Sequence, residues 1–382
     1  MRRVHTMIQS EISEIKKQFK HENTAITKVC CCYVDGEKNV KTKYTETFLC
    51  LPEEETHKYF DIFKKTLSGT IGKNLINMEF PLSEEFEGGK QEFLLRLRDS
   101  ELRDENLLNE FYDKVIQSYD TTSNYLILLI YSAYDVPGKT KDNIMMEDAS
   151  DEVYSYILCS ICPVKLAKPG LSFNEDTNQF QKRIQDWVVD RPSNGFLFPA
   201  FNDRSTDIHS ILYYSKNSEE LHHDLIDQLL GCEIPMSAGG QKETFQTLIR
   251  ETLGEECDYE IVRNIHDKLN DIIEEHKAQE IPEPLILEKA EVKNLFAESG
   301  VEEEKLQNFE KNYDEIAGEK TTLLASNVAS TRVFEVKTPD VIIKVNPERA
   351  DLVETKMVDG RRCLVIEIND QVEVNGITVR PI

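Results

Sequence analysis

The sequence lacks any apolar run long enough to cross a lipid bilayer. Its longest apolar run, Tyr125–Tyr131, falls far short of the roughly 20 residues that a spanning helix needs. The first residues, MRRVHTMIQSEISEIKK, also lack the apolar core of a secretory signal. We therefore expect a cytoplasmic protein that neither spans a membrane nor carries a secretory leader.

Basic residues are scarce relative to acidic ones. The 382 residues include 45 Lys and Arg but 70 Asp and Glu, which gives a formal net charge of -25 at pH 7. Such a charge repels phosphate backbones and anionic lipid surfaces. We expect no direct binding to nucleic acid and no attraction to a membrane surface.

The sequence also lacks a disulfide framework. The nine cysteines are an odd number, and Cys30, Cys31 and Cys32 are adjacent. The spacing of Cys159 and Cys162 is that of a zinc knuckle, but no second pair supplies the other two ligands. The pair also lies in a predicted strand, whereas a redox-active cysteine needs a helix N-terminus. Reduced, buried thiols are therefore expected, and no cofactor is predicted.

Residues 10–240 predict a mixed α/β domain, in which helices pack on a mixed sheet. The run Asn124–Ala133 is apolar on both parities, as in a central strand that is buried on both faces. The predicted helices are Ser10–Lys20, Pro52–Leu67 and Asp104–Tyr119, and the other predicted strands are Ala25–Val34, Lys41–Leu51, Ile76–Phe80, Val153–Cys162, Gly195–Phe201 and Ile208–Ser215.

Residues 241–320 form a predicted acidic helical segment, which Ile281-Pro282-Glu283-Pro284 interrupts. The segment carries 22 acidic and 10 basic side chains, a net charge of -12. One interpretation is a solvated helical face. The other is a docking surface for a basic protein partner, such as a ribosomal protein.

Residues 321–382 predict a small all-β unit of five short strands, arranged as a barrel or sandwich. Asp359-Gly360 and Asn375-Gly376 are hairpin-turn signals. Because so short a unit buries little core, we expect it to dock on the N-terminal domain or to mediate a homodimer. The fold class as a whole is α+β.

The segment Ala133–Thr140 (AYDVPGKT) matches a relaxed nucleotide-loop pattern after an apolar strand. Lys139 and Thr140 are the corresponding phosphate-binding candidates. However, Pro137 has no N–H to give to a phosphate, and residues 141–150 show no amphipathic helix. The pattern therefore favours a turn.

The densest polar cluster lies in Phe196–Ser215, where two apolar stretches flank Asn202, Asp203, Arg204, Ser205, Thr206, Asp207 and His209. Asp207 and His209 are two residues apart, so on a strand they point the same way and could share a metal ion or a proton. Asp203 or Ser205 could join them, and Arg204 could clamp an anion. The alternative is a turn in which the Asp and Asn side chains cap their own backbone and Arg204 pairs with an acid.

The single tryptophan and one pair of adjacent histidines do not indicate a functional site. Trp187, the single tryptophan, is expected to be a core anchor. His222 and His223 are adjacent, so on a helix they face different ways and do not form a metal pair.

Several runs together resemble a bacterial family known as domain of unknown function 4317, mostly from Gram-positive species. The runs are SEISEIKKQFK, FKKTLSGTIGKNLIN, QEFLLRLRDS, AYDVPGKT, GFLFPAFNDRSTDIHSILYYSKN and INDQVEVNGI. The resemblance covers nearly the whole chain from about Ser10. It implies a bacterial cytosolic protein and brings no activity, cofactor or catalytic residue.

Two functional hypotheses follow from the sequence. The first is a non-catalytic regulatory or interaction protein that binds a basic partner through residues 241–320. The second is a metal-dependent hydrolase or phosphoryl-transfer enzyme with a site around residues 202–209, built on Asp203, Arg204, Asp207 and His209.

Overall fold

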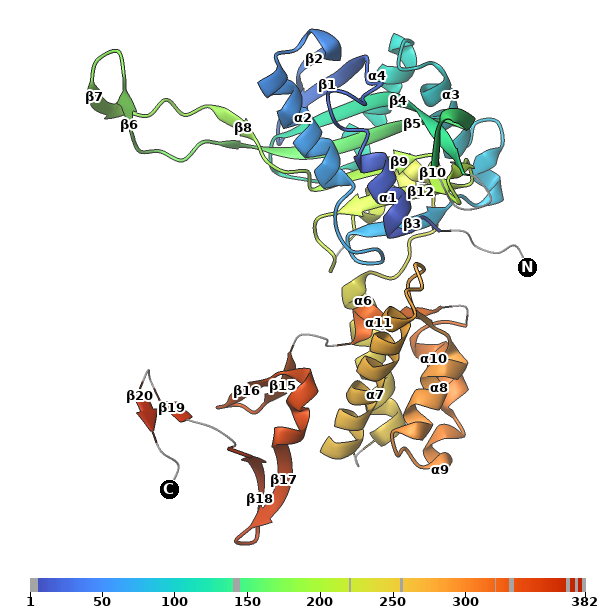
Figure 1. The fold of residues 1–382 in the computed structure, drawn as a ribbon, viewed down its shortest axis with the longest axis vertical. Coiled ribbons are helices and arrows are strands. Elements are labelled where there is room, and N and C mark those ends of the chain that lie inside the picture. Colours follow the sequence, from blue (N-terminus) through green and yellow to red (C-terminus); the bar gives the residue numbers. More distant parts are fainter. Residues whose placement is uncertain are drawn as a thin grey trace. The chain divides into compact units, whose positions relative to one another are not determined.

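The computed structural model describes residues 6–139, 145–219, 221–254, 257–319, 321–329, 333–368, 372–374 and 377–379. Contacts within the chain divide it into two compact units, Met1–Ser237 and Ala238–Ile382. We call them the sheet unit and the helical unit (Figure 1). Among the described residues, none of the helices combines the length and the apolar character that a membrane crossing requires.

The sheet unit is built on one large sheet with the strand order β2-β1-β4-β5-β9-β12-β3, and β8 pairs with β5 beside this path. All of its described pairings are antiparallel, so the mixed sheet predicted from the sequence is an antiparallel one. The strands are β1 (Lys28–Val34), β2 (Val40–Thr47), β3 (Leu75–Glu79), β4 (Tyr125–Lys139), β5 (Met145–Leu166), β8 (Trp187–Val189), β9 (Asn194–Phe198) and β12 (Ser210–Ser215).

Helices cover both faces of this sheet. On one face α1 and α2 pack over a core that includes Leu126, Leu128 and Ile130 of β4. On the other face α3, α4, α5 and η3 pack over a core that includes Ile127 and Leu129. The prediction that this strand is buried on both faces is confirmed. The helices of this unit are α1 (Gln9–Lys16), η1 (Phe48–Cys50), α2 (Glu53–Thr66), η2 (Leu82–Glu85), α3 (Lys90–Asp99), α4 (Glu105–Ser118), α5 (His223–Leu225) and η3 (Ile226–Leu230).

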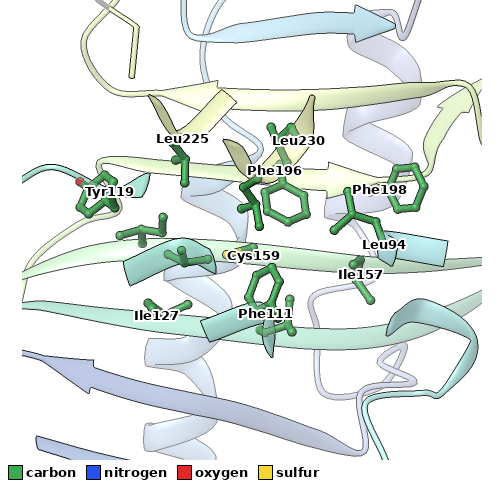
Figure 2. Packing of buried hydrophobic residues seen from close by; sticks show 14 of the residues in the cluster. Leu94, Phe111, Tyr119, Ile127, Ile157, Cys159, Phe196, Phe198, Leu225 and Leu230 are labelled. Carbon is green, nitrogen blue, oxygen red and sulfur yellow. The ribbon is translucent and has the colours of Figure 1, made fainter. Parts of the chain in front are cut away.

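The α4 helix shows how local signals and packing combine. Its N-cap Asp104 accepts hydrogen bonds from the backbone N–H groups of Asn106 and Leu107, at 2.8 and 3.2 Å, which satisfies two N–H groups that the helix itself cannot pair. One turn further on, Phe111 inserts between helix and sheet and meets the Phe196 ring edge-to-face, with centroids 6.3 Å apart (Figure 2). The N-cap and the spacing of the apolar residues therefore predict the same helix with the same buried face.

An arm continues from β5 beyond the sheet (Figure 1). Its outer part is a two-stranded hairpin of β6 (Leu171–Asn174) and β7 (Gln179–Lys182), and the return strand β8 pairs with the end of β5. The arm exposes several large apolar side chains, and Trp187 is 56% exposed. The prediction that Trp187 anchors the core is therefore wrong. The reason is its position: all three residues of β8 are exposed, so this strand adds nothing to the core.

The fluorescence of Trp187 should report on the arm alone, because the chain has no other tryptophan. We expect emission typical of a water-exposed indole and efficient quenching by acrylamide, since more than half of the side chain is exposed. Trp187→Phe should abolish the signal. Blue-shifted emission that resists quenching would contradict the exposed position.

The helical unit contains a separate core. The predicted helical character of residues 241–320 agrees with α6, α7, α8, α9 and α10, and the predicted break at Ile281–Pro284 falls between α7 and β13. The core includes Phe245, Leu269 and Phe296. The elements up to residue 329 are α6 (Ala238–Leu253), α7 (Tyr259–Ala278), β13 (Ile286–Leu287), α8 (Lys289–Glu298), α9 (Glu303–Leu306), α10 (Phe309–Ile316), β14 (Leu323–Leu324) and α11 (Ala325–Val328).

The described C-terminal strands form three separate antiparallel pairs rather than the expected barrel or sandwich. The turn between β17 and β18 has positive φ at both Asp359 (51°) and Gly360 (74°), as a type I′ hairpin requires. Asn375 and Gly376 lie outside the described residues. The pairs are β15 (Phe334–Lys337) with β16 (Ile342–Val345), β17 (Val353–Val358) with β18 (Arg361–Ile366), and β19 (Val372–Val374) with β20 (Ile377–Val379), and η5 (Pro347–Leu352) precedes β17.

The first two of these pairs contact α7 of the same unit. The Tyr259 hydroxyl donates to the Val353 carbonyl at 3.0 Å, and the Phe334 ring meets the rings of Tyr259 and His266 edge-to-face. Burial lowers the pKa of His266, and nearby Lys242 lowers it further. A neutral imidazole at this position suits the apolar contact between α7 and the C-terminal strands.

Candidate functional site

The predicted polar cluster is organised by a tight hairpin. Strands β10 (Ala200–Asn202) and β11 (Ser205–Asp207) pair antiparallel, with Asp203 and Arg204 as the two turn residues. Both turn residues have positive φ, 52° and 58°, which matches a type I′ turn. Within the polar cluster, only Asp203 and Arg204 therefore form the turn, and the residues on either side of them are paired as strands.

Arg204 joins this turn to the first helix. Its Nε and Nη2 donate to the Glu14 carboxylate at 2.8–3.2 Å, and Nη2 also donates to the Pro137 carbonyl at 3.1 Å. The backbone N–H of Arg204 donates to Glu11, whose side chain also accepts from the Ile8 N–H. The Glu14 carboxylate raises the pKa of Arg204. Burial raises the pKa of Glu11, although hydrogen bonds from both backbone N–H groups oppose the effect.

Asp207 and His209 have different partners. The Asp207 carboxylate accepts from the Asn202 amide at 2.7 Å and from the His209 backbone N–H at 3.0 Å. The His209 ring instead lies with Nδ1 2.6 Å from Glu85 Oε1. The bond from the His209 N–H to Asp207 is a local cap of the kind that the alternative interpretation predicts. The contact of the His209 ring with Glu85 instead joins the segment to η2.

The described part of the chain contains no group of three or more His, Cys, Asp and Glu side chains placed to hold a metal ion. A shared metal ion on Asp207 and His209 thus has no support from the described geometry. A catalytic role for Asp203, Arg204, Asp207 and His209 stays a prediction.

The segment that matches the nucleotide-loop pattern has an extended backbone over its described residues. Residues 133–139 belong to β4, and Pro137 lies opposite Ser150 of β5 in the register. A phosphate-binding loop would instead wrap around the phosphate and open a helix. Thr140 lies outside the described residues. Phosphate binding by Lys139 and Thr140 stays a prediction that the described strand does not favour.

The cysteines of the sheet unit are mostly buried and are all unpaired in the described structure. Cys159 belongs to the core on one face of the sheet and Cys162 to the core on the other, because residues three apart on a strand point to opposite sides. They therefore cannot share a zinc ion. Burial raises the pKa of Cys32 to about 11, which keeps this thiol protonated and unreactive at neutral pH.

A second candidate site is an acidic pocket in the helical unit. It has a volume of about 290 Å³ and lies between α7 and η5. Asp267, Asp271 and Glu274 line it from α7, where their spacing places them on one helical face. Tertiary structure then adds carboxylates from η5. The charged residues lining the acidic pocket are Asp267, Asp271, Glu274, Lys277, Glu348 and Asp351.

The electrostatics of the acidic pocket favour a cation. Burial raises the pKa of Asp267, Arg263 lowers it, and Asp271 and Asp351 raise it. The carboxylates of the pocket therefore repel one another. The Asn270 side-chain oxygen, which is buried, has no hydrogen-bond partner among the described atoms. An ammonium or guanidinium group would offset this repulsion, because it attracts each carboxylate, and it could donate a hydrogen bond to the amide oxygen.

The sequence predicts an acidic region here, but it singles out no particular residues. The usable signal was the spacing of Asp267, Asp271 and Glu274, which predicts three acids on one face of α7. No local signal indicated that Glu348 and Asp351, which come from a different segment, would complete the pocket.

These features define an α+β protein with a large helix-covered antiparallel sheet and a separate acidic helical unit. The chain belongs to the family described as domain of unknown function DUF4317, whose model matches residues 7–377. This match confirms the resemblance inferred from the sequence. A search of curated proteins finds none that matches the chain.

Proposed function

We propose that this protein has a non-catalytic interaction role and binds a basic protein partner through the acidic pocket. The observation that carries the proposal is the convergence of five carboxylates on one concave site beside the unpartnered Asn270 oxygen. A lysine or arginine side chain of the partner would enter the pocket. There it would contact Asp267 and Asp271 on one side and Asp351 on the other.

Charge over the whole segment supports the same role. The net charge of -12 over residues 241–320 extends the attraction beyond the acidic pocket itself. Such a field increases the rate of encounter with a basic partner, while contacts in the pocket determine which side chain is held. Binding should weaken as salt rises, because exposed charges are screened.

The test compares two variants with the same change in charge. Asp267→Asn/Asp271→Asn/Asp351→Asn neutralises the pocket, and Glu302→Gln/Glu303→Gln/Glu304→Gln neutralises three exposed acids near α9. Binding of a synthetic Lys/Arg-rich peptide to the full chain is measured by fluorescence anisotropy at low and high salt.

We expect the pocket variant to bind the peptide at least about tenfold more weakly, or about 1.4 kcal/mol, because it loses the contacts that position the cation. The control variant should lose much less, since it alters only the long-range field. Equal losses in both variants would indicate non-specific attraction. That outcome, or the absence of binding to the unaltered chain, would refute a specific pocket.

A further inference from the structure

The sheet unit contains a cavity of about 500 Å³ that none of the functions above uses. It lies at the end of the sheet where β9 begins and its antiparallel neighbour β12 ends. Ser193 and Asn194 line it at the start of β9, and Ser215 and Lys216 line it at the end of β12. Helix α4 ends beside it, and α5 begins there.

A buried polar network forms the floor of this cavity. The Asn194 side chain is almost completely buried; its amide donates to the Tyr213 hydroxyl at 2.8 Å and its oxygen accepts from the Tyr119 hydroxyl at 3.2 Å. Ser193 Oγ lies 2.8 Å from the Tyr119 hydroxyl oxygen and donates to the Ile161 carbonyl at 3.1 Å.

Proton counting shows that this floor can rearrange. Ser193 and Tyr119 carry one hydroxyl proton each, yet their oxygens take part in three contacts: with each other, with Asn194 and with Ile161. One contact is always without a proton, so the Ser193 hydroxyl can turn towards an acceptor that enters the cavity. Such an acceptor would gain a hydrogen bond without leaving Asn194 unpaired.

The walls supply a lysine and the imidazole ring of His222. The ring of His222 packs against the Tyr119 ring with centroids 4.7 Å apart at 34°. The backbone of Lys216 is fixed beside Ser193, because its N–H donates to the Ser193 carbonyl at 2.8 Å. The nearby Asp190 carboxylate interacts with Lys216, but it already binds Lys165 Nζ at 2.9 Å.

The described lining of this cavity differs in charge from the protein as a whole. None of the described residues that line it is acidic, although the chain carries 70 acidic residues among 382. A lysine, a histidine and a serine are instead among the residues that line it. Concave sites with a few convergent polar groups are the usual form of small-molecule sites.

We propose that this cavity binds a small organic anion. Its carboxylate or phosphate group would contact Lys216 and His222 and accept from Ser193. The site is in the sheet unit, so the proposal is independent of the basic partner assigned to the helical unit.

The experiment titrates the full chain by calorimetry with benzoate, phenyl phosphate and benzyl alcohol. The three probes share a ring and differ in carrying a carboxylate, a phosphate or no charge. Lys216→Gln and His222→Gln alter the wall without removing the buried floor. Lys58→Gln, an exposed lysine on α2, controls for the loss of one positive charge.

We expect at least one of the two anions to bind with a dissociation constant of about 1 mM, and benzyl alcohol to bind at least about tenfold more weakly. Lys216→Gln and His222→Gln should each weaken the anion at least about fivefold, whereas Lys58→Gln should leave it unchanged. The anion that binds better identifies the headgroup. Any of three results would overturn the proposal. They are equal binding of benzyl alcohol, no effect of Lys216→Gln on anion binding, and no binding of either anion at about 10 mM, ten times the expected dissociation constant.

Discussion

Replacing Phe111 with alanine is expected to lower the free energy of unfolding of the sheet unit by about 3–5 kcal/mol. Phe111 is fully buried, and its ring packs between α4 and the sheet against Phe196 (Figure 2). Alanine would lose these contacts and leave a cavity that rigid neighbours such as Cys159 and Ile127 fill only in part. Urea denaturation followed by circular dichroism measures the loss.

The control for this prediction is Gln117→Ala on the same helix. Gln117 is exposed, and its backbone carbonyl, which the substitution retains, accepts a hydrogen bond from Lys38 Nζ. Its effect should stay within about 0.5 kcal/mol. A similar loss in both variants would mean that α4 tolerates no change at all, and a small loss in Phe111→Ala would mean that this core collapses around the vacancy.

Arg204→Ala is expected to lower the free energy of unfolding of the same unit by about 2–3 kcal/mol. The substitution removes the paired hydrogen bonds to Glu14 and the bond to the Pro137 carbonyl. Glu14 would keep its bond from the Tyr134 hydroxyl, in a place where each side chain of the pair is 17% exposed. Because some water still reaches the pair, the loss should be smaller than the roughly 3–5 kcal/mol of a fully buried pair.

Two comparisons separate this structural role from a catalytic one. Arg103→Ala removes an arginine that pairs with Glu101 at the surface, and should cost less than about 1 kcal/mol. Glu14→Ala combined with Arg204→Ala should cost less than the sum of the single losses, because the two side chains stabilise each other. If Arg204 mainly held an anionic substrate, Arg204→Ala would leave the stability close to that of the unaltered chain.

The two proposed sites differ in the charge of the residues that line them. The acidic pocket of α7 and η5 would take a cation from a protein, whereas the cavity beside Lys216 and His222 would take a small anion. Neither proposal needs a catalytic residue. Together they describe a protein that could bind a partner with one unit and a small molecule with the other.

Elements with local signals could be predicted from the sequence. Asp104 and the apolar spacing behind it define α4, and the run from Tyr125 to Ile130 defines a central strand. Asp359-Gly360 likewise defines a two-residue turn. In each case the deciding interactions join residues that are close in the sequence, or follow from a periodicity that the sequence displays directly.

Tertiary structure alone decided where these elements meet. Trp187 has the composition of a core residue, yet β8 lies at the end of β5, where the core has ended. The partner of Arg204 is Glu14, 190 positions away, and Asp351 reaches the acidic face of Asp267 from another segment. Such pairings depend on how strands order themselves and which faces become covered. No periodicity or spacing within one segment encodes them, because the contact exists only after the chain has folded.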